Sequence, residues 1–236
     1  MILYPLPMPG DITLHVHMVP FVQAEFDPLS FDTAGIACPP SIARSAPKRQ
    51  AEFFFGRLAA RAALQDFGAT TSEVLIGAGR EPVWPAHVVG SISHIDGLAG
   101  AVVGARTRHG GLGIDLVQTA AGESQAALRT TIIDADELSC LHTAAGALTL
   151  DELVTLVFSA KESLYKAAYG TVGCLFGFEA ARVETVDVLQ GIVTLVLTHD
   201  LHPQFARGRR CDITFARLDK ATFITAFEAG LQSSGS

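Results

Sequence analysis

The stretch GLGIDLV, residues Gly111–Val117, places a single acidic residue in an otherwise apolar segment with the alternating pattern of a β-strand. Successive side chains of a strand point to opposite faces, so Asp115 shares its face with Gly113 and Val117, opposite Ile114 and the two leucines. A carboxylate among apolar neighbours is costly unless it is paired, hydrogen-bonded or bound to a cation. Taken alone, the stretch favours an aspartate that caps a loop at a strand end, and the alternative is a metal ligand.

Strand and helix patterns alternate on both sides of this segment. The helix predicted over residues 41–67 has Ser45 as a possible cap and Gly68 as its stop. Strands are predicted within residues 1–40 and at 98–105, 111–117, 178–188, 191–200, 209–219 and 222–230, and further helices at 123–130, 134–146 and 149–169. The order predicts an α+β protein with an N-terminal lobe, residues 1–113, and a C-terminal lobe, residues 114–236, that act as one functional unit.

The composition indicates a globular protein with a large core and limits its partners. The chain has 236 residues, of which 49% are hydrophobic, and a formal net charge of −7. No basic residue precedes Arg44, and the uncharged runs are too short to span a bilayer, so we expect a soluble, cytoplasmic protein without a membrane span. The four cysteines lack the close spacing of a zinc or redox motif, and an acidic chain does not suit a nucleic-acid binder.

The segment FSAKESLYKAAYG, Phe158–Gly170, contains a second acidic candidate on a predicted helix. Glu162 and Lys166 are four residues apart and therefore share a helix face, as an ordinary surface ion pair would. However, Lys161 and Lys166 are two of only four lysines in the chain and lie in an otherwise apolar helix. From the residues alone, a surface pair and a catalytic group are equally good interpretations.

A basic segment on the predicted helix 41–67 is the third candidate. Five of the eight lysines and arginines in residues 1–113 fall there: Arg44, Lys48, Arg49, Arg57 and Arg61. Arg57 and Arg61 lie one helical turn apart, with Arg49 two turns before Arg57, and a guanidinium fork can bond two phosphate oxygens at once. The pattern alone favours a solvated helix face over a phosphate site.

The stretch GREPVWPAHVVGSISH, Gly79–His94, ends in an adjacent serine and histidine. A nucleophile elbow requires Gly-x-Ser-x-Gly, which this stretch does not provide. Neighbours on a strand also face opposite ways, so Ser93 and His94 do not suit a nucleophile–base pair. Their hydroxyl and imidazole can instead donate to a polyanion, although a lone histidine is more often structural. The sequence contains no Walker loop and no dinucleotide-binding fingerprint.

Taken in order, GREPVWP, GSISH, GLGIDLV and FSAKESLYKA resemble the motifs of the 4′-phosphopantetheinyl transferases, in particular the large monomeric type that activates surfactin and enterobactin synthetases. The segment KRQAEFFFGRLAARAAL resembles the basic helix of the bacterial members. The resemblance runs from about Lys48 to Ala167 and implies two similar α/β lobes related by a pseudo-twofold axis, with coenzyme A in the cleft between them. It implies Mg²⁺-dependent transfer of 4′-phosphopantetheine from coenzyme A to a serine of an apo acyl, peptidyl or aryl carrier protein, with release of adenosine 3′,5′-bisphosphate.

The resemblance also implies a role for each site residue. Asp115 corresponds to a Mg²⁺ ligand and Glu162 to the ligand from the second lobe. Lys161 and Lys166 would lie near the pyrophosphate and the incoming serine. The other groups that bind coenzyme A would be Arg49 and Arg57 at its 3′-phosphate, Ser93 and His94 at its phosphates, and Arg80 before the proline. Glu162 is the preferred base for the carrier serine, and Lys166, the second choice, would need a lowered pKa.

One position departs from the family pattern. Many relatives have Asp-x-Glu in the strand motif, whereas this chain has Val117 at the third position, and some members also lack an acid there. Mg²⁺ commonly keeps several waters, so we expect weaker metal binding rather than lost activity. The alternatives are a coenzyme A-binding pseudoenzyme or regulatory module, which only Val117 favours, and a serine hydrolase built on Ser93 and His94.

A carrier protein of the resembled systems is typically acidic, as this chain is, so docking should rest on a local basic or apolar patch. The segments 119–130 and LHTAAGAL, residues 141–148, are candidates for a region that faces the carrier. Helices that simply connect the lobes are the more ordinary interpretation of both segments.

Overall fold

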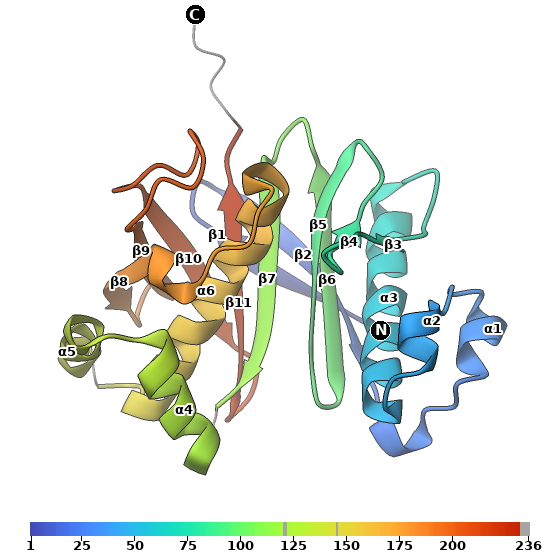
Figure 1. Ribbon diagram of the computed structural model, residues 1–236, viewed down its shortest axis with the longest axis horizontal. Coiled ribbons are helices and arrows are strands. Elements are labelled where there is room, and N and C mark those ends of the chain that lie inside the picture. The colour runs from blue at the N-terminus through green and yellow to red at the C-terminus, as the bar shows by residue number, and fades with distance from the viewer. Residues whose placement is uncertain (120–121, 145, 232–236) are drawn as a thin grey trace, which may run out of the picture.

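The computed structural model describes residues 1–119, 122–144 and 146–231, which form two main sheets, each covered by one long helix (Figure 1). The first sheet has the strand order β1-β2-β6-β5 and the second has the order β7-β11-β10-β9-β8. Paired strands run antiparallel in both sheets. The α+β class expected from the sequence is confirmed.

The first lobe is built on the four-stranded sheet, whose edge strand accepts prolines. Pro5 and Pro7 lie in β1, at the edge of the sheet, where a missing N–H need not interrupt a ladder. The strands are β1 (Ile2–Met8), β2 (Ile12–Pro20), β5 (Val88–Ile95) and β6 (Leu98–Ala105). The helices are η1 (Gln23–Glu25), α1 (Ser30–Ala34), α2 (Pro40–Ala43) and α3 (Pro47–Phe67), and β3 (Leu75–Ile76) pairs with β4 (Pro82–Val83).

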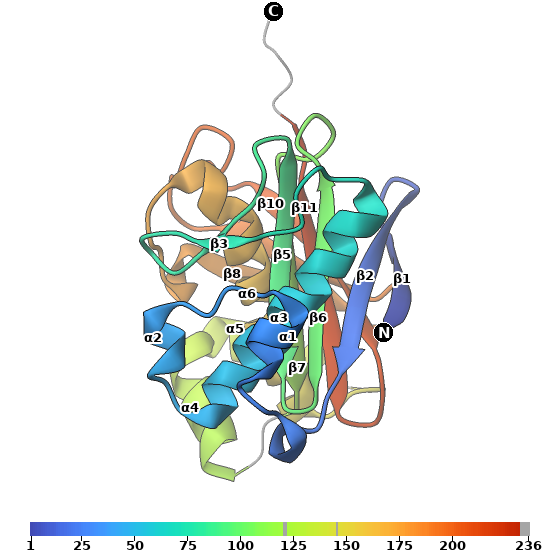
Figure 2. The same ribbon diagram turned by 90° about the vertical axis from the view of Figure 1, so that its right-hand side faces the viewer.

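Helix α3 crosses the face of the first sheet over β5 and β6 (Figure 2). The prediction of one helix over 41–67 with a Ser45 cap is wrong, because α3 begins at Pro47, whose fixed φ suits the first helical position. The Ser45 hydroxyl instead donates to the carbonyl of Ile42, 2.7 Å away. The predicted stop is confirmed, since Gly68 ends the helix in the left-handed conformation with φ 78°.

The second lobe is built on the five-stranded sheet, which α6 covers on one face (Figure 1). Its strands are β7 (Gly111–Gln118), β8 (Ala181–Asp187), β9 (Ile192–Leu197), β10 (Arg210–Arg217) and β11 (Thr222–Ala229). Its helices are α4 (Gly122–Ile132), α5 (Ala135–Ala144), α6 (Leu150–Val172) and η2 (Phe178–Ala180). A capping box formed by Thr149 and Glu152 starts α6, and Gly173, with φ 72°, ends it, one turn later than expected.

The two sheets meet along β5 and β7, which lie side by side at the centre of the molecule (Figure 1). The hydroxyl of Ser91 accepts from the N–H of Ile114 and that of Ser93 from the N–H of Leu116, both at 3.0 Å. The partners advance by two residues in the same direction on both strands, so β5 and β7 run parallel. Serine side chains thus take the place of the carbonyls that a backbone ladder would use.

The leucines of β7 share one face, as the alternating pattern predicted, and this face packs against the first lobe. Leu112, Ile114 and Leu116 belong to one buried cluster with Val16 and Val102 of the first sheet. This shared core joins the lobes into one packed unit. Because β7 lies entirely in the second sheet, we propose to divide the lobes in the turn at 106–110 rather than at 113/114, which would cut the strand.

Within the described ranges, none of the helices combines the length and the apolar character that crossing a bilayer requires.

Candidate functional site

Two glycines of β7 let helix α6 lie directly on the strand. A Cβ on Gly111 would lie 2.1 Å from the carbonyl oxygen of Ala167, and one on Gly113 would lie 2.0 Å from that of Ser163. Both distances are far below any real contact, so a side chain at either position would force the helix away. The pattern Gly-x-Gly-x-Asp therefore brings α6 against Asp115, which shares the glycines' face.

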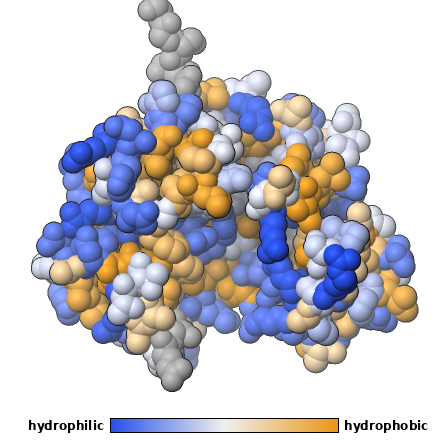
Figure 3. Space-filling view, viewed as in Figure 1, coloured by the Kyte–Doolittle hydropathy of each residue, from blue (hydrophilic) through white to orange (hydrophobic). Residues whose placement is uncertain are grey.

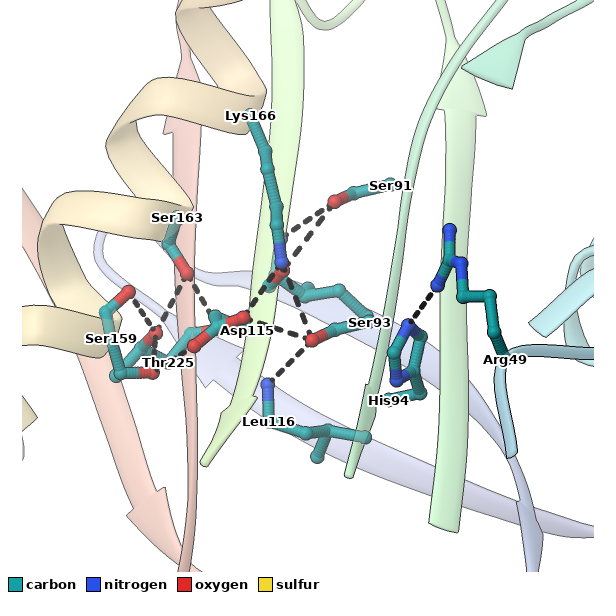
Figure 4. Close-up of polar contacts among 11 residues, drawn as sticks. Arg49, Ser91, Ser93, His94, Asp115, Leu116, Ser159, Ser163, Lys166 and Thr225 are labelled. Atoms are coloured by element: carbon teal, nitrogen blue, oxygen red, sulfur yellow. Dashed lines mark hydrogen bonds and ion pairs between the residues drawn. The ribbon is translucent and has the colours of Figure 1, made fainter. Parts of the chain in front are cut away.

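Asp115 is buried inside β7, with 7% of its surface exposed, so the interpretation as a cap at a strand end is wrong. Its Oδ1 atom accepts from the Ser93 hydroxyl at 2.9 Å and from the Lys166 ammonium at 2.7 Å. Its Oδ2 atom accepts from the Ser159 hydroxyl at 2.8 Å (Figure 4). These three donors replace the water that the buried carboxylate has lost.

Lys166 reaches this carboxylate from helix α6. Besides the ion pair with Asp115, its Nζ donates to the carbonyl of Ile114 at 3.1 Å and to the hydroxyl of Ser93 at 3.3 Å. Three acceptors match the three N–H donors of an ammonium group. Lys166 is therefore held as a cation at the junction of the two lobes, and the surface ion pair with Glu162 is not formed.

Glu162 lies on the same face of α6, one turn before Lys166. Burial raises the pKa of the half-buried Glu162 carboxyl, the Lys166 cation lowers it, and the Asp115 charge raises it further. Among the described residues, no hydrogen bond or ion pair involves this carboxylate. Glu162 is thus an acid group with free acceptor capacity within electrostatic reach of Asp115.

Lys161 points away from this cluster, and its expected place near the pyrophosphate stays a prediction. Its ammonium forms a 2.8 Å ion pair with Glu137 and donates to the carbonyl of Ile132 at 2.7 Å. The Lys161 and Glu137 side chains are 4% and 3% exposed. At 100° per residue, Lys161 and Lys166 lie about 140° apart on the helix, so α6 cannot direct both lysines to Asp115.

Ser93 and His94 point to opposite sides of β5, as the strand geometry predicted (Figure 4). The Ser93 hydroxyl donates to Asp115 and accepts from the Leu116 N–H and the Lys166 ammonium, and its expected contact with a coenzyme A phosphate stays a prediction. No bond joins Ser93 to His94 in the described chain, so these two residues do not form a nucleophile–base pair.

The His94 side chain instead contacts helix α3, which carries the basic residues. The guanidinium of Arg49 donates to Nε2 of His94 at 3.1 Å, so the imidazole is neutral with its proton on Nδ1. Burial lowers the pKa of His94, and Arg49 lowers it further, while the nearby Glu52 carboxylate opposes both. Arg49 remains about half exposed and also faces Glu52 at 3.4 Å.

Arg57 continues the basic face of α3 away from His94. Its guanidinium lies 4.6 Å from the ring centre of Phe53 and donates to the carbonyl of Leu75 at 3.4 Å, while its buried Nε has no hydrogen-bond partner in the described part of the chain. Burial and the Arg49 charge lower the pKa of Arg57 to about 10. Arg57 and the neighbouring Arg61 both line a cavity of about 320 Å³, and the Arg61 guanidinium also donates to the carbonyls of Ala34 and Gly35.

Arg80 lies in the turn between β3 and β4 and has a left-handed backbone with φ 70°. It lines a cavity of about 620 Å³ between the lobes, together with Trp84, Tyr169 and Lys166. Hydrophilic side chains occupy the depression between the two halves of the molecule, with apolar surface on both sides (Figure 3). The structure thus brings Asp115, Lys166 and Glu162 together, joins Arg49 to His94, and leaves Lys161 apart.

The sequence analysis missed four hydroxyl groups around Asp115. They belong to Ser91, Ser159, Ser163 and Thr225. A signal for two of them was present, because Ser159 and Ser163 share a helix face with Glu162 and Lys166. Thr225 had none, since only strand pairing brings β11 beside Asp115. The sequence also gave no signal for Glu137, the buried ion-pair partner of Lys161.

Comparison with known proteins agrees with this geometry. Residues 39–104 match the 4′-phosphopantetheinyl transferase N-terminal domain, and residues 111–218 match the 4′-phosphopantetheinyl transferase superfamily. Enterobactin synthase component D of Salmonella typhi is 34% identical over 184 residues, which cover 78% of this chain and 73% of the relative. This chain belongs to the 4′-phosphopantetheinyl transferase family.

Two further relatives extend the comparison. Enterobactin synthase component D of Escherichia coli K12 is 38% identical over 166 residues, covering 69% of this transferase and 73% of the relative. The 4′-phosphopantetheinyl transferase PptT of Mycobacterium tuberculosis is 37% identical over 149 residues, covering 61% and 62%. The transferase is therefore an enzyme that moves phosphopantetheine from coenzyme A to carrier proteins, as the sequence motifs predicted.

Proposed function

We propose that this transferase uses the Asp115–Glu162 side of the cleft for chemistry and the Arg49–His94 side to hold the coenzyme A phosphates. The observation that carries the proposal is that helix α6 brings Lys166 into an ion pair with Asp115 of β7 and places Glu162 within electrostatic reach of both. Phosphoryl transfer requires mainly positioning and charge neutralisation, which such a cluster can supply. Arg80 and Arg57 extend the basic groups along the two cavities described above.

The reacting hydroxyl belongs to the carrier protein. Its serine oxygen attacks the phosphorus that carries pantetheine, a new P–O bond forms, and the bond to the leaving adenosine 3′,5′-bisphosphate breaks. Glu162 takes the serine proton, directly or through water, because its carboxylate is free and its raised pKa makes it a stronger base. Lys166 is the weaker candidate for the base, since its three donors already hold Asp115, Ile114 and Ser93.

The residues present fit a Mg²⁺ ion. Asp115 and Glu162 would hold it, because the Asp115 charge raises the pKa of Glu162 and the Glu162 carboxylate has an open acceptor. Among the residues with described positions, no group of three His, Cys, Asp or Glu side chains forms a complete metal site. Mg²⁺ does not need one, since it is usually held by one or two carboxylates plus substrate phosphates. When bound, it would neutralise charge on the pyrophosphate.

Carrier choice and cellular setting follow from the relatives and the family. The enterobactin synthase components among them favour a carrier of siderophore biosynthesis, ahead of polyketide, nonribosomal peptide or fatty acid carriers. We propose a cytoplasmic monomer. Of the candidate carrier-facing segments 119–130 and 141–148, residues 122–130 lie in α4 and residues 141–144 in α5, and residues 120, 121 and 145 lie outside the described ranges.

The decisive experiment is a mass-shift assay over a panel of apo carrier proteins. Incubation with coenzyme A and Mg²⁺ should add the mass of 4′-phosphopantetheine to at least one carrier. A protein that binds coenzyme A but modifies no carrier at any Mg²⁺ concentration would support the pseudoenzyme alternative, which rests on Val117. Inertness to an organophosphate probe would remove the serine hydrolase alternative.

A further inference from the structure

A chain of buried hydroxyl groups leads from strand β11 through helix α6 to Asp115 (Figure 4). The hydroxyls of Ser163 and Thr225 are 2.7 Å apart, those of Thr225 and Ser159 are 2.9 Å apart, and Ser159 lies 2.8 Å from Oδ2 of Asp115. All three hydroxyl residues have no exposed surface. The chain leads away from the cleft, so no substrate group reaches it.

Each hydroxyl has only one proton to donate, and this determines which oxygen donates and which accepts along the chain. An ionised carboxylate only accepts, so Ser159 must give its single proton to Asp115. The Ser159 oxygen can then only accept from Thr225, and the Thr225 oxygen accepts from Ser163. Ser163 and Thr225 each carry a single proton, which is shared between the next hydroxyl and a carbonyl oxygen, Thr225 O at 3.1 Å from Ser163 and Ser159 O at 2.9 Å from Thr225.

We propose that Ser159 is a positioning residue for Asp115, and that Thr225 and Ser163 fix the direction in which its hydroxyl donates. The inference rests on the proposed function, in which Asp115 holds Mg²⁺. Hydrogen bonds in a chain strengthen one another, and outer partners of a metal ligand set its orientation. The effect should be large in this chain, because Val117 leaves Asp115 as the only carboxylate on its face of β7.

The test separates the hydroxyl of Thr225 from its shape. Thr225→Val keeps the volume and removes the hydroxyl, whereas Thr225→Ser keeps the hydroxyl and removes a methyl group. Thr214→Val is the matched control, because Thr214 is a buried threonine on the neighbouring strand β10 whose hydroxyl has no hydrogen-bond partner among the described residues. Ser159→Ala is the direct variant.

The measurement is the affinity for Mn²⁺, a paramagnetic substitute for Mg²⁺, by titration of the free ion's EPR signal with coenzyme A present. We expect about 10- to 100-fold weaker Mn²⁺ binding in Ser159→Ala and Thr225→Val. Thr225→Ser and Thr214→Val should bind Mn²⁺ as the unaltered protein does, and coenzyme A binding in EDTA should be the same in all.

The outcomes separate the inference from the proposed function. Equal Mn²⁺ affinity in Thr225→Val and Thr214→Val would overturn the role of the chain, even if both lose thermal stability. Equal loss in Thr225→Ser and Thr225→Val would show that packing rather than the hydroxyl matters, and would overturn it too. Failure of the unaltered protein to bind Mn²⁺ with coenzyme A would instead refute the proposed metal site. If Ser159→Ala does not fold, the threonine pair still decides the question.

Discussion

The two walls of the proposed coenzyme A site hold their charges in opposite ways. On the wall of the second lobe, Asp115 is buried and all of its contacts come from fixed donors on β5 and α6. On the side of the first lobe, Arg49 is about half exposed, and Arg57, which lines a separate cavity of about 320 Å³, keeps a buried N–H without a partner in the described chain. We call the side of Asp115 the complete wall, because fixed donors already satisfy its carboxylate. We call the side of Arg49 and Arg57 the open wall, because it keeps N–H donors that can still bind an anion.

The difference follows from what each wall must do. A carboxylate that is to stay ionised inside a protein needs its donors in place before any ligand arrives. Groups that bind a phosphate must keep their donors free, at the cost of burying cations with few partners. Burial lowers the pKa of Arg57 to about 10, because it disfavours the cation, and an anion beside the guanidinium would offset this cost. The complete wall is therefore preorganised for chemistry, and the donors of the open wall find their acceptors when the substrate binds.

Removal of the charge from the complete wall should have the largest effect. Asp115→Asn keeps the shape but loses the ion pair with Lys166 and the proposed metal ligand. We expect kcat/KM in the carrier assay to fall on the order of 10²–10³-fold, as for loss of a preorganised electrostatic group. Asp96→Asn, which removes a surface carboxylate paired with Lys48, is the control and should retain full activity. A loss below ten-fold in Asp115→Asn would mean that the walls do not divide the work in this way.

Lys161→Met tests whether Lys161 contributes to catalysis at the complete wall or only to the stability of the fold. The variant leaves Glu137 buried without its cation, which should lower the free energy of unfolding by about 3–5 kcal/mol. Urea denaturation measures this loss, and the folded fraction should keep nearly normal kcat and KM. Normal stability with impaired kcat would contradict a role in stability alone and support the expectation from the family resemblance.

Arg57→Gln probes the open wall. Hydrogen bonds from charged donors contribute about 1.5–3 kcal/mol each, so KM for coenzyme A should rise roughly ten- to a hundred-fold with little change in kcat. Arg44→Gln alters an exposed arginine at the start of the same region and serves as the control. An equal rise in both variants would indicate a general charge effect rather than a phosphate site.

Val117→Glu adds an acid to the complete wall on the same face as Asp115. We expect the Mg²⁺ concentration for half-maximal activity to fall about ten-fold, because a third carboxylate replaces a metal-bound water. Val117→Gln adds the same bulk without charge and should not lower it. Unchanged metal dependence in Val117→Glu would count against a metal beside Asp115.

The pH dependence of coenzyme A binding gives the smallest effect. In the free protein the pKa of His94 lies below its ordinary value of 6.5, because burial disfavours the cation. A bound phosphate favours the cation, so the pKa rises on binding and a proton is taken up between the two values. Without Mg²⁺, affinity should therefore increase a few-fold as the pH falls through the bound-state pKa and level off below the free-state pKa. His94→Gln should abolish this slope in calorimetric titrations, and an unchanged slope would assign the proton to another group.

Local patterns in the sequence determined most of the longer helices and strands and half of the site. Alternation placed Asp115 with the glycines and away from the leucines, and the four-residue spacing placed Glu162 and Lys166 on one helix face. The motifs identified the family from roughly half of the chain. These features depend on residues within one or two turns of each other, where the periods of 2 and 3.6 residues hold whatever the rest of the chain does.

Only the tertiary structure decided which partners these residues have. The spacing of Lys161 and Lys166 did not reveal that one pairs with Glu137 and the other with Asp115, because each partner lies on a different element. The same holds for Ser93, whose hydroxyl joins the lobes by accepting from the Leu116 N–H, and for Thr225, which strand pairing brings to Asp115. Such contacts join segments far apart in the chain, and the packing of the two lobes, rather than any local period, sets their geometry.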